Sequence, residues 1–332
     1  MRKNEQKTSK KLFKKIDNRK MSRSHKSSDR SSSYDRTKKV QEVEDEELAN
    51  LNDRLLEKGT TVVRDLLNGE PLSPNSDSLD REFHIKEIDL RNLEPVSKDS
   101  NDGVKYIFMG KCKSGKSQLI KAVMMNKNFI PCCQVYSGTE DSNKSFSENV
   151  PALNIYNGLS NPDIKRFIHR QKLAIRHLDN PWGLLVIDDC FDKPSQFREP
   201  LWLSIFKNSR HWKLLTLIAL QWCLDLLPSE RSLVDYSFIF AEPSETVRKR
   251  LWMNFGSVVG TFPDFCDIMT QGTENYTAIV FKNLESSNKL EDRIGWYRAN
   301  INLVNSDWRF GHPLLWQFSQ DRFNTSYEDP LI

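Results

Sequence analysis

The distribution of apolar residues predicts alternating strands and helices after about residue 104. Short, continuous apolar runs are typical of strands buried on both faces by helices, which is the arrangement of a parallel α/β sheet. The patterns between these runs predict a helix over 116–125 and a longer one over 161–178, with Pro162 at a favoured first-turn position. The expected strands are 104–109, 129–135, 153–156, 183–187, 214–220 and 236–240, followed by 277–281 and 295–297 as an antiparallel edge.

The chain before residue 101 follows a different pattern. Residues 42–67 carry leucines and valines near helical spacing, interrupted at Gly59, which indicates two short helices. A stretch rich in proline and serine, 71–78, is typical of a linker. We therefore expect a disordered basic tail over 1–40, short helical segments and linker over 41–100, a folded domain over 101–320, and a C-terminal tail over 321–332.

Charge separates the tail from the body. Residues 1–40 contain 15 Lys/Arg and 4 Asp/Glu, whereas the whole chain of 332 residues contains 49 and 45, so the net charge of +4 hides a basic tail on a mildly acidic body. A segment with so little to bury cannot offset its chain entropy. It could bind DNA phosphates without sequence preference, act as a nuclear-import signal, dock on an acidic protein, or simply be solvated.

The composition favours an intracellular protein without a membrane span. No stretch approaches the roughly 20 consecutive apolar residues that a span needs, and the N-terminal region lacks the apolar core of a secretory signal. The six cysteines form no Cys-x-x-Cys pair and no zinc-type spacing with histidine, which suggests free thiols in a reducing compartment.

A phosphate-binding motif follows the first expected strand. Residues 110–117 read Gly-Lys-Cys-Lys-Ser-Gly-Lys-Ser and match G-x-x-x-x-G-K-[ST] at every fixed position. Backbone N–H groups of such a loop surround phosphate oxygens, and the helix that follows adds the positive end of its dipole. The alternative, a surface turn rich in Gly and Lys, does not explain its place between a strand and a helix. The expected nucleotide-binding residues are Gly110, Lys111, Cys112, Lys113, Ser114, Gly115, Lys116, Ser117 and Gln118.

Two acids end a later apolar strand. Asp188 and Asp189 directly follow Leu184-Leu-Val-Ile. The motif predicts that Lys116 contacts the β- and γ-phosphates of ATP and that Ser117 ligates Mg²⁺. Asp188, at the end of a neighbouring strand, is placed to hold Mg²⁺ through the water shell of the ion. Asp189 is then placed to orient or deprotonate the attacking water. Taken alone, the acid pair could also be the N-cap of a helix.

Three further residues are candidates for catalysis. Gln221 follows the next expected strand, where its amide could sense the γ-phosphate or position water, or merely close the strand. An arginine is also expected to neutralise charge in the transition state, from the same chain or a neighbouring subunit. Arg210 and Arg231, near the ends of segments that flank that strand, are the candidates, although either could be an ordinary surface arginine.

With these residues in place, the chain resembles the genome-packaging ATPases of large double-stranded DNA viruses of the poxvirus and iridovirus type, within the FtsK–HerA superfamily of P-loop ATPases. The resemblance covers roughly 104–318 and leaves 1–100 outside. In that superfamily the second acid of the pair at the end of the strand is usually Glu, whereas this chain has Asp189. The blocks that carry it are 110–117, Leu185-Val-Ile-Asp-Asp-Cys190, Ser209-Arg210-His211, Gln221, Leu227-Pro228, Arg231, Asp235-Tyr236, Thr273-Glu-Asn-Tyr276 and Trp296-Tyr-Arg-Ala299.

The resemblance implies a motor that uses ATP and Mg²⁺ to thread double-stranded DNA into a capsid. It implies a homo-oligomeric ring, a capsid or portal-vertex protein as partner, and a host-cell assembly site and the virion as locations. In such a ring Arg210 would reach the neighbour's γ-phosphate.

Two other functions fit a P-loop. A small-molecule phosphotransferase usually has an arginine-rich lid, and no clear lid is found between the acidic strand and Gln221, although Lys207 and Arg210 fall in that segment. A nucleotide-gated binding protein would hydrolyse ATP slowly until a protein partner accelerates it. The chain lacks the Asn-Lys-x-Asp guanine signature and the Leu-Ser-Gly-Gly signature of ABC proteins, which lowers the GTPase and ABC forms of this alternative.

Overall fold

The computed structural model describes residues 85–191, 194–222, 225–287 and 289–324. The predicted basic tail, most of the predicted helical segment and linker, and residues 325–332 lie outside the described residues. Within the described ranges, no helix has the length and hydrophobicity required to cross a bilayer.

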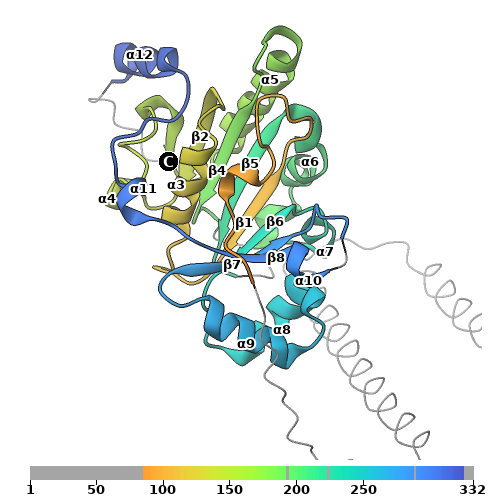
Figure 1. Ribbon diagram of the computed structural model, residues 1–332. Coiled ribbons are helices and arrows are strands. Elements are labelled where there is room, and N and C mark those ends of the chain that lie inside the picture. Colours follow the sequence, from red (N-terminus) through yellow and green to blue (C-terminus); the bar gives the residue numbers. More distant parts are fainter. Residues whose placement is uncertain (1–84, 192–193, 223–224, 288, 325–332) are drawn as a thin grey trace, which may run out of the picture. The chain divides into compact units, whose positions relative to one another are not determined.

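The described strands form one eight-stranded sheet in the order β3-β2-β4-β5-β1-β6-β7-β8 (Figure 1). The pairs from β3 to β6 are parallel, whereas β6–β7 and β7–β8 are antiparallel. The predicted α/β fold, a mostly parallel sheet of the P-loop type with an antiparallel edge, is therefore confirmed. The strands are β1 Lys105–Met109, β2 Cys132–Ser137, β3 Ile155–Asn157, β4 Gly183–Asp188, β5 Leu214–Leu220, β6 Tyr236–Ile239, β7 Thr277–Lys282 and β8 Ile294–Arg298.

Helices connect these strands, and several are single turns. Helix α5 begins with proline in its first turn, as expected, and the predicted 116–125 helix is α3. The α-helices are α3 Lys116–Asn126, α4 Glu140–Asn143, α5 Asn161–His177, α6 Pro200–Asn208, α7 Pro228–Arg231, α8 Glu245–Leu251, α9 Phe262–Gly272, α10 Leu290–Arg293, α11 Ile301–Val304 and α12 Pro313–Arg322. The short 3₁₀ helices are Leu90–Asn92, Ala152–Asn154, Pro194–Arg198, Ser209–Trp212 and Ser257–Val259, and Trp252–Gly256 is a π-helical turn.

The sheet separates two hydrophobic clusters. Side chains alternate along a strand, so Tyr106 and Phe108 of β1 join one cluster while Ile107 and Met109 join the other. Helix α3 packs in the first cluster, and α5, α6 and α9 pack in the second. Burial on both faces explains why β1, β4 and β5 are continuous apolar runs rather than alternating ones.

The segment before β1 packs on the sheet. Ile88 N donates to Trp296 O at 2.9 Å, and Trp296 N donates to Lys86 O at 3.0 Å, which attaches this segment to β8. Leu90 and Leu93 are buried in the cluster that contains α3. Lys127 Nζ, at the end of α3, donates to Leu93 O at 2.6 Å. Residues 85–93, which precede the domain expected over 101–320, therefore pack on the folded body.

Candidate ATP site

The loop between β1 and α3 has the geometry of a phosphate-binding loop. Gly110 lies so close to its neighbours that a Cβ there would come within 2.6 Å of Ser114 Oγ and 2.9 Å of Phe240 Cβ. Gly115 has a φ of +102°, in the left-handed region that favours glycine. The two fixed glycines of the motif are thus required for different reasons, one for close approach and one for backbone conformation.

Lys116 begins α3 and folds back over this loop. Its side chain is buried, and Nζ donates to Gly110 O at 2.9 Å and to Lys111 O at 3.0 Å. The same Nζ lies 3.7 Å from Asp189 Oδ1. The ammonium group is therefore held at the mouth of the loop, where a P-loop lysine meets the terminal phosphates.

Ser117 and Asp188 meet across the gap between α3 and β4. Ser117 Oγ donates to Asp188 Oδ2 at 2.6 Å, although the residues are 71 positions apart. Asp188 is 2% exposed. Burial, reinforced by the charges of Asp189 and Glu140, raises the pKa of Asp188 to about 6, against the opposing effects of the Ser117 hydrogen bond and Lys116.

These residues fit a magnesium ion. Asp188 Oδ1 is buried without a hydrogen-bond partner among the described residues, so one carboxylate oxygen is available as a ligand. A hydroxyl and a carboxylate are hard oxygen donors, and Mg²⁺ typically takes only one or two protein ligands, with water and phosphate oxygens completing its shell. In the described part of the chain, no group of three or more His, Cys, Asp or Glu residues is arranged to hold a metal.

Asp189 leaves the strand in an unusual conformation. Its φ of +49° is left-handed, which aspartate tolerates better than most residues. The end of β2 packs against it, because a Cβ on Gly138 would lie 2.4 Å from Asp189 O. Asp189 Oδ1 is buried and has no hydrogen-bond partner in the described ranges, but it faces the Lys116 ammonium. The turn thus directs the carboxylate toward the phosphate loop.

Gln221 borders the same site. Strand β5 lies between β4 and β1 in the sheet, and Leu220 O accepts a hydrogen bond from Gly110 N at 3.2 Å. Gln221, the next residue, is exposed at this edge. The structure therefore brings Lys116, Ser117, Asp188, Asp189 and Gln221 together at the carboxyl edge of the parallel strands.

Arg210 lies at the opposite edge of the sheet. It precedes β5, and Arg210 O accepts a hydrogen bond from Gly103 N, just before β1. Its Nη2 lies 2.9 Å from Asp235 Oδ1, at the start of β6. The five residues of β1 span roughly 16 Å at strand geometry, so Arg210 cannot reach the phosphate loop of its own chain.

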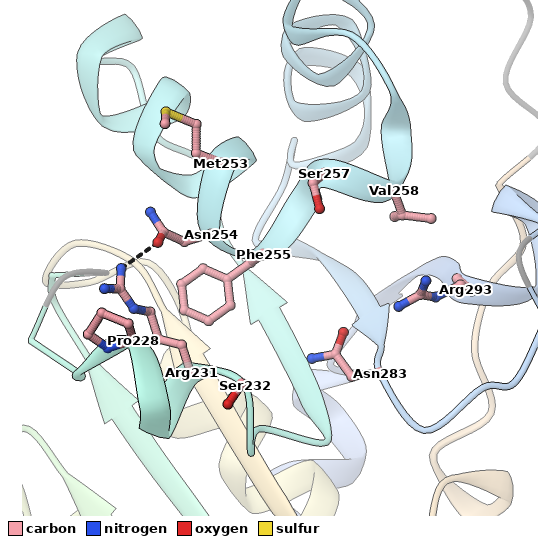
Figure 2. A pocket seen from close by; sticks show the side chains of 10 residues that line it. All are labelled: Pro228, Arg231, Ser232, Met253, Asn254, Phe255, Ser257, Val258, Asn283 and Arg293. Atoms are coloured by element: carbon pink, nitrogen blue, oxygen red, sulfur yellow. Dashed lines mark hydrogen bonds between the residues drawn. The ribbon is translucent and has the colours of Figure 1, made fainter. Parts of the chain in front are cut away.

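Arg231 also lies near the amino edge. Its Nη1 donates to Asn254 Oδ1 at 2.5 Å, and it lines a pocket of about 750 Å³ together with Arg293 (Figure 2). Asn283 in the same pocket donates its backbone N–H to Asp235 O at 2.9 Å, which fixes the pocket beside the start of β6. Neither candidate arginine therefore approaches the phosphate loop within one chain, and a role in catalysis would require a neighbouring subunit.

Comparison with known proteins places the chain among viral proteins. No protein-family model matches it. The uncharacterized protein 088R of Invertebrate iridescent virus 3 is 40% identical over 220 residues, which cover 65% of this chain and 84% of that protein. The uncharacterized protein 075L of Invertebrate iridescent virus 6 is 36% identical over 251 residues, which cover 74% and 97%. The chain belongs to the family of these iridescent-virus proteins.

Membership in the iridescent-virus family confirms the viral resemblance inferred from the sequence. Among solved structures, the chain is similar to the genome packaging NTPase B204 of Sulfolobus turreted icosahedral virus 2 in complex with AMP. That similarity has a TM-score of 0.45 at 15% identity and covers 60% of this chain and 99% of the other.

Glu140 is a buried acid near Asp188 that was not among the residues expected from the sequence. It follows β2, is 6% exposed, and accepts a hydrogen bond from Phe146 N at 3.0 Å. Its charge contributes to the raised pKa of Asp188. The available signal in the sequence was an acid three residues after β2, the strand that pairs with β4.

Asp235 joins two cations at the amino edge, and its replacement is expected to destabilise the fold of this family member. Lys105 Nζ lies 3.0 Å from Asp235 Oδ2, and both side chains are almost fully buried, while Arg210 binds the other oxygen. Asp235→Ala would leave Lys105 as an uncompensated buried charge. We expect the free energy of unfolding to fall by about 3–5 kcal/mol in urea denaturation.

The matched control is Asp307→Ala, which removes an exposed acid. It is expected to change the free energy of unfolding by less than about 0.5 kcal/mol. Equal effects of the two substitutions would show that the Lys105–Asp235–Arg210 cluster contributes nothing to stability.

Proposed function

We propose that the chain is an ATP-hydrolysing DNA translocase that packages viral double-stranded DNA. The observation that carries the ATPase part is the contact of Ser117 with Asp188, beside a buried Lys116 whose ammonium faces the phosphate loop. Membership in a family of viral proteins and the sequence blocks outside the phosphate loop support the packaging part.

The side chains at the carboxyl edge suit hydrolysis of a terminal phosphate. Lys116 would neutralise charge on the β- and γ-phosphate oxygens, and Gln221 would position the attacking water. A bound Mg²⁺, held by Ser117 and Asp188, would offset the remaining phosphate charge. The oxygen of the attacking water would bond to the γ-phosphorus while the bond from that phosphorus to the ADP oxygen breaks. Asp189 would accept the proton that the water releases.

A ring of identical subunits is part of the proposal. Arg210 and Arg231 both lie near the edge of the sheet remote from their own phosphate loop, so either could act only on a neighbour's nucleotide. Arg210 is 43% exposed in its side chain and already bound to Asp235, whereas Arg231 lines an open pocket. The proposed partners are double-stranded DNA and a capsid or portal-vertex protein, in infected cells and the virion.

Duplex DNA is expected to stimulate ATP hydrolysis by the oligomeric protein. Steady-state phosphate release would be measured with Mg²⁺, with and without linear duplex DNA, and with single-stranded DNA for comparison. Because the DNA contact is expected to be largely electrostatic, the stimulation should weaken as salt is raised. Hydrolysis indifferent to any DNA, in a sample shown to be oligomeric, would remove the translocase part and leave the ATPase part.

The same assay distinguishes the phosphotransferase alternative. A kinase would transfer the γ-phosphate to a metabolite instead of releasing free phosphate. The position of Arg210 weighs against this alternative, because Arg210 lies at the far edge of the sheet and cannot cover the phosphates of its own chain.

A further inference from the structure

An exposed aromatic ring borders the phosphate loop and has no role in the proposed hydrolysis. Tyr276 is 69% exposed, although it lies immediately before the buried strand β7. A Cβ on Gly115 would lie 3.6 Å from Tyr276 Cβ and from its ring atom Cδ1. The phenol ring thus stands next to the last residue of the loop before α3 begins.

The backbone holds this ring in place at some conformational expense. Asn275 and Tyr276 have φ values of +54° and +63°, so two successive non-glycine residues are left-handed. Asparagine tolerates this region, but it is uncommon for an aromatic residue. Thr277 N donates to Glu274 O at 3.0 Å across the turn, and Thr277 then enters β7. Strain of this kind is often found where a side chain is held ready for a ligand.

The direction of a bound nucleotide follows from the sheet order. The metal-binding end of the site, Asp188 with Gln221, lies on the β4–β5 side of β1. Tyr276 precedes β7, which lies beyond β6 on the other side of β1. Tyr276 therefore lies on the opposite side of the phosphate loop from Asp188, the side that a nucleotide with its γ-phosphate near Asp188 leaves for its ribose and base.

We infer that Tyr276 is the platform on which the base of the bound nucleotide stacks. The inference rests on the proposed function, because it assigns the base subsite of the same ATP site. A ring offers its face to any base, so the contact would strengthen binding of ATP and GTP alike and would not select between them.

The test compares ATP with inorganic tripolyphosphate, which has the phosphates but no base. Dissociation constants for both would be measured by calorimetry with Mg²⁺ for the wild type, Tyr276→Ala, Tyr276→Asn and Tyr276→Phe. Asparagine suits the left-handed backbone but lacks a ring, so it separates loss of the ring from backbone distortion. Both ring-less variants are expected to bind ATP about tenfold to a hundredfold more weakly and to bind tripolyphosphate as the wild type does. Tyr276→Phe should retain ATP binding.

Two outcomes would overturn the inference. Equal weakening of ATP and tripolyphosphate in Tyr276→Asn would assign Tyr276 to the shape of the phosphate loop, and unchanged ATP binding in both ring-less variants would remove any role. Failure of the ATP site on which the proposed function depends has a different signature, because the wild type would then bind neither ligand.

Discussion

Lys116→Ala is expected to lower the rate of ATP hydrolysis by roughly 10²–10³-fold, the usual loss when one charge-stabilising donor is removed from a transition state. Lys116 is buried at the mouth of the loop, and its ammonium is held there by Gly110 O and Lys111 O. Alanine cannot supply this charge to the terminal phosphates. The measurement is steady-state phosphate release with saturating ATP and Mg²⁺.

The matched control is Lys165→Ala, which removes an exposed lysine from helix α5, far along the chain from the phosphate loop. It should retain the wild-type rate. A thermal unfolding scan of both variants would show that each is folded. If Lys116→Ala kept a rate within about threefold of the wild type, hydrolysis would not use this loop, and the ATPase assignment would be wrong.

The carboxyl-edge site could be predicted from the sequence because the phosphate loop, the acid pair and Gln221 each come at the end of an apolar strand. Carboxyl ends of parallel strands meet at one edge, so Asp188 and Gln221 were expected beside the phosphate loop once the sheet was taken as parallel. The direction of the chain likewise places Arg210 away from this site. It precedes β5, so it belongs to the amino edge, where it binds Asp235.

Other features depended on contacts that local patterns do not encode. The apolar run 129–135 predicted a strand, but Pro131 cannot donate a ladder hydrogen bond, and β2 begins only at Cys132. Leu90 and Leu93 are too few to form a periodic pattern, yet both are buried against the body. The left-handed backbone at Tyr276 could not be predicted, because no glycine stands at this turn to indicate it. The roles assigned to the site residues remain predictions, because they concern chemistry rather than placement.

Asp188→Asn is expected to abolish Mg²⁺-dependent hydrolysis and, at neutral pH without metal, to stabilise the protein. The first effect, at least about 100-fold in rate, follows from loss of the anionic ligand that faces Ser117. The second follows from burial, since the pKa of Asp188 is about 6 in the folded protein, against an ordinary value of 3.8. The folded state therefore stabilises the protonated carboxyl, and ionisation at neutral pH opposes folding.

The sign of the pH dependence is fixed by this shift. Between pH 3.8 and about 6 the folded protein retains a proton that the unfolded chain has released, so stability falls as pH rises through this window. Above it, the wild type should be less stable than Asp188→Asn by up to about 3 kcal/mol. The gap should close as pH falls toward 4. Urea unfolding at several pH values, in the presence of a chelator, would measure it.

Asp307→Asn, an exposed acid changed in the same way, should show no such gap. Adding Mg²⁺ and ATP should make the wild type more stable than Asp188→Asn, because a ligand that binds only the folded wild type stabilises it by mass action. If the free energy of unfolding changed with pH in the same way for the wild type and Asp188→Asn, with or without ligand, Asp188 would be neither a destabilising buried charge nor a metal ligand. If the wild type is less stable than Asp188→Asn without ligand and more stable with Mg²⁺ and ATP, then Asp188 serves ligand binding and destabilises the ligand-free fold.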